Sequence, residues 1–276
     1  MAVKRKNTTA ALSPAERQEK RKLRRGIVLL ISLVLLLAGI TAGVIWLNKR
    51  MFRENRHFTL RRVEIVSSGF YGKNAASRRE LIRRMDLKPG QDNLFKLDVK
   101  KLREDLRTRQ PNIEDAQVAV ILPDTLYVKV EERIPRAFLG RPNSPLVADA
   151  NCMVMRASES LGVHPNLPVI VGMPHHALRP GERHEKLREA LNLIMTVQHY
   201  RCFSVAAVNL SVPDELFVIM DYRSGNMVRR YRVTMPRKNY PENLDILQSA
   251  IAEARKRGND HTRINLTFDG QVVLGR

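Results

Sequence analysis

The histidines are the first residues to test for chemistry, because they bind metals and transfer protons near neutral pH. Among the seven histidines, only His175, His176 and His184 form a cluster. A helical metalloprotease site needs two histidines one turn apart, with a glutamate as general base. After His184 the chain continues as Glu-Lys-Leu-Arg, so the second histidine is absent. We therefore expect loop histidines and predict no metal site.

The other reactive side chains form no recognisable catalytic motif. The chain has no G-x-S-x-G elbow and no G-x-x-x-x-G-K-[ST] phosphate loop. Its two cysteines, Cys152 and Cys202, are not spaced as zinc ligands. An oxidising compartment would permit a disulfide between them, but the sequence does not give their separation, so bridged and free thiols both stay open. We predict no catalytic residue, no cofactor and no enzymatic activity.

The distribution of charge indicates a membrane anchor. The 276 residues carry a formal net charge of +20, of which residues 1–25 hold nine Lys/Arg and two Glu. Residues 26–47, GIVLLISLVLLLAGITAGVIWL, contain no charge. As a helix they would span roughly 33 Å, about the thickness of a bilayer core. A secretory signal would have a shorter apolar region and a small-residue cleavage site, so we expect an uncleaved transmembrane helix after a disordered cytoplasmic tail.

The flanking cations predict the orientation of this anchor. Nine Lys/Arg precede it, and six lie in the 20 residues that follow. The positive-inside rule therefore favours a cytoplasmic N-terminus, with the remaining chain on the other side of the inner membrane. The cations beyond the tail are scattered and only 5% of residues are aromatic, so we do not expect a nucleic-acid partner.

The elements after a linker over residues 48–57 predict a small α+β domain over residues 58–135. Residues 58–66 alternate as a strand, and Ser77 with Glu80 matches a helical capping box. Asp98 is a candidate N-cap for a second helix, which Pro111 ends. A hairpin follows, with apolar residues alternating on both sides of Pro123. The predicted order is strand, helix, helix, strand, strand, with the two helices covering one face of the sheet.

Residues 136–276 predict a second, mixed α/β domain with an antiparallel sheet. Short strands are expected near residues 146–147, 153–155 and 168–171, then a helix over residues 183–200. Three longer strands are expected at residues 205–210, 216–222 and 228–235. Pro241 and Gly258 frame a last helix. Residues 264–268 and 271–274 are expected to pair as a terminal hairpin about Asp269-Gly270.

Several runs of the first domain resemble the POTRA domain of the FtsQ/DivIB family of bacterial cell-division proteins. Residues 90–98 (GQDNLFKLD) are similar to the family's Gly-x-x-Leu-Phe-x-Leu-Asp run. Residues 113–118 (IEDAQV) and 122–126 (LPDTL) follow in the family order, and residues 130–135 (VEERIP) match its Val-x-Glu-x-x-Pro. The basic tail, single anchor and β-rich C-terminal domain also agree with the family plan, so the resemblance covers nearly the whole chain.

The resemblance implies a non-enzymatic scaffold at the division septum. Such a protein is expected to bind the single-span coiled-coil proteins FtsB and FtsL, to contact other division proteins through the POTRA domain, and to help recruit and regulate septal peptidoglycan synthases. The family's last strand region receives the partner. Here that region implies the binding residues Leu266, Thr267, Phe268, Asp269, Gly270, Gln271, Val272 and Val273.

Three positions depart from the family pattern. Thr267 stands where relatives often have Arg, and Asn112 replaces a frequent Trp. The usual Asp-x-x-Gly turn of the β domain reads Asp149-Ala150-Asn151-Cys152. Two alternative functions agree less well with the sequence. One is a docking factor for protein export or outer-membrane assembly, which would ordinarily precede a membrane barrel. The other is a membrane-tethered hydrolase, which the missing motifs disfavour.

Overall fold

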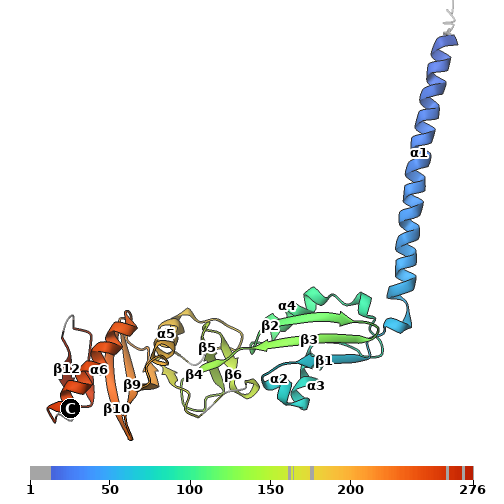
Figure 1. Ribbon diagram of the computed structural model, residues 1–276. Coiled ribbons are helices and arrows are strands. Elements are labelled where there is room, and N and C mark those ends of the chain that lie inside the picture. The colour runs from blue at the N-terminus through green and yellow to red at the C-terminus, as the bar shows by residue number, and fades with distance from the viewer. Residues whose placement is uncertain are drawn as a thin grey trace, which may run out of the picture.

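A long helix leads into two folded units that lie end to end (Figure 1). The computed structural model describes residues 14–160, 163, 165–174, 177–258, 261–268 and 271–275, with side-chain surroundings from residue 27 onward. The long helix is α1 (Pro14–Asn48), and it runs on into a π-helical turn, η1 (Lys49–Arg53). The C-terminus lies at the end of the molecule farthest from α1 (Figure 1).

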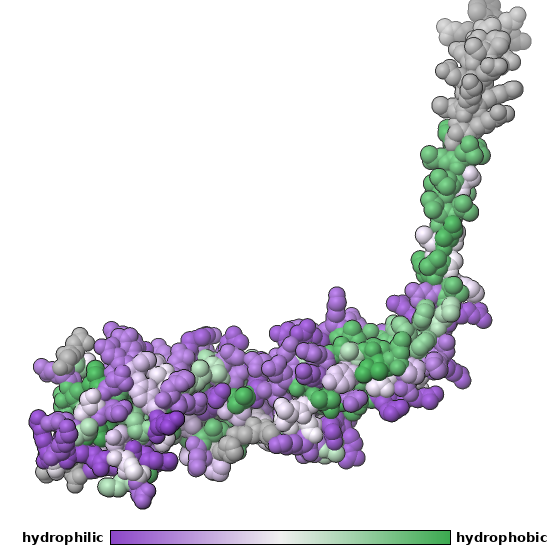
Figure 2. Space-filling view, in the orientation of Figure 1, coloured by the Kyte–Doolittle hydropathy of each residue, from purple (hydrophilic) through white to green (hydrophobic). Residues whose placement is uncertain are grey.

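The apolar part of α1 is exposed along its whole length. Among the described residues, one helix is long and apolar enough to cross a membrane, Ile27–Arg53, with a mean hydropathy of 2.8 and no buried residue. Figure 2 shows it as a continuous green rod that projects from a mostly purple body. An exposed apolar surface of this size is stable only in lipid, so the helix fits the predicted single membrane span.

The unit that follows α1 contains a three-stranded sheet in the order β1-β3-β2, and we refer to it as the three-stranded unit. Strand β1 pairs in parallel with β3, and β2 pairs with β3 as an antiparallel hairpin. Its elements along the chain are η2 (Arg56–Phe58), β1 (Arg62–Val66), α2 (Phe70–Lys73), α3 (Ala75–Arg84), η3 (Leu94–Lys96), α4 (Val99–Arg109), β2 (Ile113–Ile121) and β3 (Thr125–Glu132).

The start of α3 corrects the predicted capping box. The Asn74 side chain caps this helix by accepting hydrogen bonds from the amides of Ala76 and Ser77 at 2.9 and 3.4 Å. The helix therefore begins directly after Asn74, and Ser77 already lies inside its first turn. Glu80 pairs with Arg84 instead of reaching back to Ser77. The predicted cap of α4 is confirmed, because Asp98 Oδ1 accepts from the Lys101 amide at 3.0 Å. A one-turn helix, α2, was not predicted.

The second unit, the nine-stranded unit, is built on one sheet in the order β12-β11-β10-β9-β8-β7-β4-β5-β6. Its strands are β4 (Pro135–Leu139), β5 (Leu146–Asp149), β6 (Val154–Arg156), β7 (Val169–Val171), β8 (Phe203–Asn209), β9 (Glu215–Ser224), β10 (Met227–Pro236), β11 (Arg263–Asn265) and β12 (Val273–Gly275). Its helices are η4 (Ala157–Glu159), η6 (Glu185–Leu187), α5 (Arg188–Val197) and α6 (Tyr240–Lys256).

This sheet is mixed, whereas an antiparallel sheet was predicted. The pairings β4·β7, β7·β8 and β10·β11 are parallel. Parallel neighbours need a crossover connection, and α5 and α6 provide it before β8 and β11. A helix expected between two strands can therefore indicate that the strands pair in parallel.

Alternate residues of the central strands supply two cores on opposite faces of the sheet. In β4, Ala137 and Leu139 join the larger core with α5 and α6, while Phe138 joins a smaller core on the other face. Strand β7 divides in the same way, with Ile170 in the larger core and Val169 in the smaller. This is the period-two alternation of strand side chains.

The junction between the two units is tied by polar contacts. Asn112 is only 1% exposed, and its side chain donates to Arg156 O at 2.8 Å and to Ser160 Oγ at 2.6 Å. Beside it, the Arg133 guanidinium pairs with the Asp149 carboxylate at 2.8 Å, with only 11% and 4% of these side chains exposed. The polar Asn112, where the family often has Trp, is thus an interdomain contact.

Candidate functional site

The last strand, β12, is an open edge of the nine-stranded sheet. It pairs with β11 on one side, with Ile264 opposite Leu274, and no strand of the described residues lies on the other. The Leu266 amide donates to Thr234 O at 2.8 Å, so Leu266 and Ile264 turn their backbone groups toward β10. Because backbone N–H and C=O groups alternate in direction along a strand, those of Asn265 and Val273 point toward each other. The N–H and C=O groups of Leu274 therefore face the open edge.

The structure places most of the predicted binding residues in the loop before this edge. Leu266 is buried, and Thr267 folds back so that its amide and hydroxyl donate to Asn265 Oδ1 at 2.9 and 2.7 Å. Phe268 is 54% exposed, and its carbonyl accepts from the Gln271 amide at 3.1 Å. Val272 packs partly against the larger core, and Val273 begins β12. Asp269 and Gly270 lie outside the described residues.

The antiparallel pairing predicted for the chain end is present but shorter than predicted. Strand β11 ends at Asn265 rather than at residue 268, and β12 begins at Val273 rather than at residue 271. The physical reason is that Asn265 and Thr267 form a side-chain turn, which competes with ladder bonds.

An apolar groove of about 580 Å³ lies beside this edge, between α6 and β12. Ile246 and Ala250 of α6 and Val272 and Leu274 of the chain end provide its apolar walls, with Asp245, Ser249, Glu253 and Arg257 among its polar lining residues. Ile246 is 40% exposed although α6 already buries Leu247 and its neighbours on the other face. Groove and strand edge together could accept an extended segment and an apolar side chain.

Sequence reasoning missed the α6 side of this groove. A signal was present, because Ile246 and Ala250 are four residues apart and lie outside the buried stripe of α6. An apolar pair on the second face of an amphipathic helix indicates a second contact surface.

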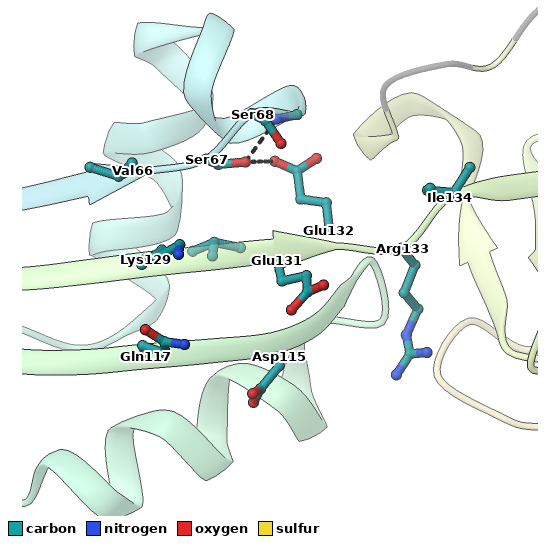
Figure 3. A pocket seen from close by; sticks show the side chains of 12 residues that line it. Val66, Ser67, Ser68, Asp115, Gln117, Lys129, Glu131, Glu132, Arg133 and Ile134 are labelled. Atoms are coloured by element: carbon teal, nitrogen blue, oxygen red, sulfur yellow. Dashed lines mark hydrogen bonds between the residues drawn. The ribbon is translucent and has the colours of Figure 1, made fainter.

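A larger cavity of about 640 Å³ lies at the end of the three-stranded unit nearest the junction (Figure 3). Its acidic residue Glu132 accepts from Ser67 Oγ at 2.5 Å and from the amides of Phe70 and Tyr71 at 2.6 and 2.9 Å. Figure 3 shows the Ser67 hydroxyl turned toward this carboxylate. A carboxylate with three donors at the start of α2 has a structural role, so we do not assign chemistry to this cavity.

In the described part of the chain, the other side chains that could do chemistry do not form a site either. Within the described residues, no three His, Cys, Asp or Glu side chains could share a metal ion. His184 lies near Glu182, and His175 and His176 lie outside the described residues. Both cysteines are free thiols, Cys152 buried and Cys202 half-buried. Burial raises the pKa of both thiols, so neither is an activated nucleophile.

Comparison with known proteins identifies the first folded unit. The family model described as "POTRA domain, FtsQ-type" matches residues 59–133, which form the three-stranded unit and its short approach. Residues 59–133 therefore form a POTRA domain of the FtsQ type. The family resemblance found in the sequence is thereby confirmed, and the three-stranded unit is called the POTRA domain from here on.

Three curated relatives extend the similarity beyond the POTRA domain, and each is named Cell division protein FtsQ. The protein of Koribacter versatilis is 25% identical over 95% of this chain and 77% of its own length. That of Syntrophotalea carbinolica is 25% identical over 79% of this chain and 74% of its own length. That of Geobacter sp. is 28% identical over 62% of this chain and 61% of its own length. These relatives support a cell-division protein.

The Asp149–Cys152 turn, which departs from the family pattern in sequence, has the backbone conformation that the pattern implies. Asp149 Oδ1 accepts from the amides of Asn151 and Met153 at 2.9 and 2.8 Å. Cys152 has a φ of +63°, the left-handed conformation that favours glycine. The family's Gly therefore matches the backbone, and this chain holds a buried cysteine in the same conformation.

Proposed function

We propose that this chain is a non-enzymatic scaffold of the division machinery that binds FtsB/FtsL-type single-span coiled-coil proteins. Residues 266–273, together with β12 and the α6 groove, form the binding site. By holding these partners at the septum, the protein helps to recruit and regulate septal peptidoglycan synthesis. The observation that carries the proposal is an open strand edge beside an apolar groove.

The proposed organisation follows the limits inferred from the sequence. A cytoplasmic tail (1–25) and a span (26–47) lead through a linker (48–57) to the POTRA domain (58–135) and the β domain (136–276). The cation excess before the span supports a cytoplasmic N-terminus, which places both folded units outside the inner leaflet. The binding site is then at the far end from the membrane helix (Figure 1).

Proline substitution at Leu274 tests strand addition directly. Leu274→Pro removes an N–H that faces the open edge, and no bond to β11 is lost. Leu274→Ala is the matched control, because it shortens the side chain in the groove but keeps the N–H. We expect the full-length chain, co-expressed with the FtsB- and FtsL-type proteins of its host, to co-purify with them.

In this assay the Leu274→Pro variant should co-purify with at least tenfold less partner than the Leu274→Ala variant. Phe268→Ala should also weaken capture, because its exposed ring is available to a partner. If Leu274→Pro and Leu274→Ala retain equal amounts of partner and both remain folded, the partner does not pair with β12.

A further inference from the structure

The POTRA domain has its own open strand edge, at β1. In the order β1-β3-β2, β1 has β3 on one side, and none of the strands in the described part of the chain lies on the other. The amides of Arg61 and Arg62 both donate to Asp124 O, on the β3 side, at 2.8 and 3.2 Å. By alternation, the N–H and C=O groups of Val63 and Ile65 face the open edge, and no described residue bonds to them.

A groove runs along this edge, between β1 and α3. Two adjoining hollows of about 380 and 550 Å³ share Val63, Glu64 and Ile82 as lining residues. Val63 and Ile82 are only partly buried and pack against the POTRA core. The floor of the groove is therefore apolar, and side chains of an added strand could rest on it.

Four arginines flank the groove. They are Arg61 and Arg62 at the start of β1 and Arg78 and Arg79 on α3. Among the described residues, none of their side chains has an ion pair or a hydrogen bond. Glu64 is the one carboxylate in the groove, so the positive charge is largely uncompensated.

Arginines on the other side of the POTRA domain are compensated. On α4, Arg103 pairs with Asp115 at 2.8 Å and Arg109 with Asp105 at 3.2 Å. Farther along α3, Arg84 pairs with Glu80 and Glu159 at 3.0 and 3.2 Å. Within the described part of the POTRA domain, the arginines without an ion pair thus gather at the β1 edge, where they create a positive field that attracts a negative ligand.

We propose that the β1–α3 groove is a second docking site, which binds an extended acidic segment of a partner protein as an added strand. The free backbone groups of Val63 and Ile65 pair with the segment, and its carboxylates meet Arg61, Arg62, Arg78 and Arg79. A strand of about five residues matches the length of β1. The site is separate from β12, which lies in the other unit.

A peptide fits this surface better than lipid headgroups do. In Figure 1, β1 and α3 form the border of the POTRA domain that is turned away from the N-terminal end of α1. A headgroup-binding surface would face the bilayer that α1 crosses. A strand edge with free N–H and C=O groups also matches a polypeptide backbone and has no counterpart in a headgroup.

The test uses the full chain in zwitterionic nanodiscs and a fluorescent peptide that alternates Glu and Val over eight residues. We expect binding, seen as a rise in anisotropy, that weakens as salt increases. The same peptide N-methylated at alternate amides should bind at least tenfold more weakly, because it cannot form the ladder. An alternating Lys-Val peptide should not bind.

Charge reversal then locates the site. Arg78→Glu with Arg79→Glu should weaken binding at least tenfold. The matched control is Lys100→Glu with Lys101→Glu on α4, which makes the same change of charge at two exposed neighbours and should leave affinity within twofold. Circular dichroism would verify that both variants fold.

Several results would overturn the proposal. No binding of the Glu-Val peptide at millimolar concentration excludes an acidic-strand site, and equal affinity for the N-methylated peptide excludes strand addition. Equal losses in the two charge-reversal variants would show non-specific attraction. Arginine-dependent capture of anionic nanodiscs, without peptide binding, would assign the surface to lipid.

Discussion

At the scale of single residues, Glu132 joins two segments that are far apart in the sequence. It lies at the end of β3, and its carboxylate holds the turn after β1 through Ser67, Phe70 and Tyr71. A Cβ on Gly69 would collide with this carboxylate, so the turn and the glutamate depend on each other. Of the two glutamates that end β3, Glu132 thus has a structural role and Glu131 is exposed.

Replacing Glu132 by Gln should destabilise the POTRA domain by about 1.5–3 kcal/mol, because charge-assisted bonds to buried donors are lost. The neighbouring exposed Glu131→Gln should change the free energy of unfolding by less than about 0.5 kcal/mol. Urea unfolding of both variants measures the difference. Equal stabilities would show that the carboxylate is not a structural contact.

The two thiols provide a second prediction at this scale. Burial raises the pKa of Cys152 and Cys202, so the reactive thiolate is scarcer at any pH than for a free cysteine. Alkylation of the native protein should be slow at pH 7 and accelerate as the pH rises above the ordinary thiol range. Protein prepared without reductant should show two titratable thiols after unfolding, and a lower number would reveal a disulfide.

At the scale of secondary elements, the start of α3 has two candidate N-caps, Asn74 and Ser77, and only Asn74 caps the helix. Asn74 accepts from two amides of the first turn, whereas Ser77 is already inside the helix. The capping-box motif was present, but a stronger Asx cap lies three residues earlier. Local motifs can thus compete, and the one that satisfies the first free amides determines where the helix begins.

Alanine substitution at these two positions separates the caps. Asn74→Ala should lower the free energy of unfolding by about 1 kcal/mol, because the first-turn amides lose their acceptor. Ser77→Ala should be neutral or slightly stabilising, since alanine has the higher helix propensity. Thermal melts of both variants provide the measurement, and the reverse order of stability would restore the predicted capping box.

At the scale of the whole molecule, the relative position of the two units depends on a small polar junction. Asn112 and Asp149 are buried there, Arg133 is half-buried, and Asn112 bonds to Arg156 and Ser160. The two open edges, β1 and β12, lie in different units. The junction therefore fixes the geometry in which two partners could be held together.

Asn112→Ala should loosen this junction and cost about 1–3 kcal/mol, because the backbone of Arg156 loses its buried partners. We expect the unfolding of the two units to separate in calorimetry and the distribution of molecular lengths in small-angle scattering to broaden. Asn151→Ala is the control, since Asn151 contacts Glu114 from an exposed position at the same junction. A single unchanged transition for Asn112→Ala would assign the domain arrangement to other contacts.

The sequence by itself determined the features that depend on local pattern. The uncharged run of residues 26–47 was enough to predict the long apolar helix, because a bilayer-length stretch needs no tertiary context. Alternation predicted the hairpin β2–β3 and the strands β8, β9 and β10, and Asp98 was correctly assigned as the cap of α4. The motifs around residues 90–135 predicted a POTRA domain, and the family model that matches residues 59–133 confirms it.

The tertiary structure decided everything that depends on which segments meet. Parallel pairing of β10 with β11 follows from the crossover through α6, and no periodicity within either strand encodes it. The groove beside β12 combines α6 with the chain end, and the β1 groove combines a strand with α3. Arg103 and Arg78 look alike in the sequence, yet the fold gives a carboxylate partner only to Arg103. Burial and charge compensation are properties of neighbours in space, which is why the two proposed docking surfaces could be inferred only from the fold.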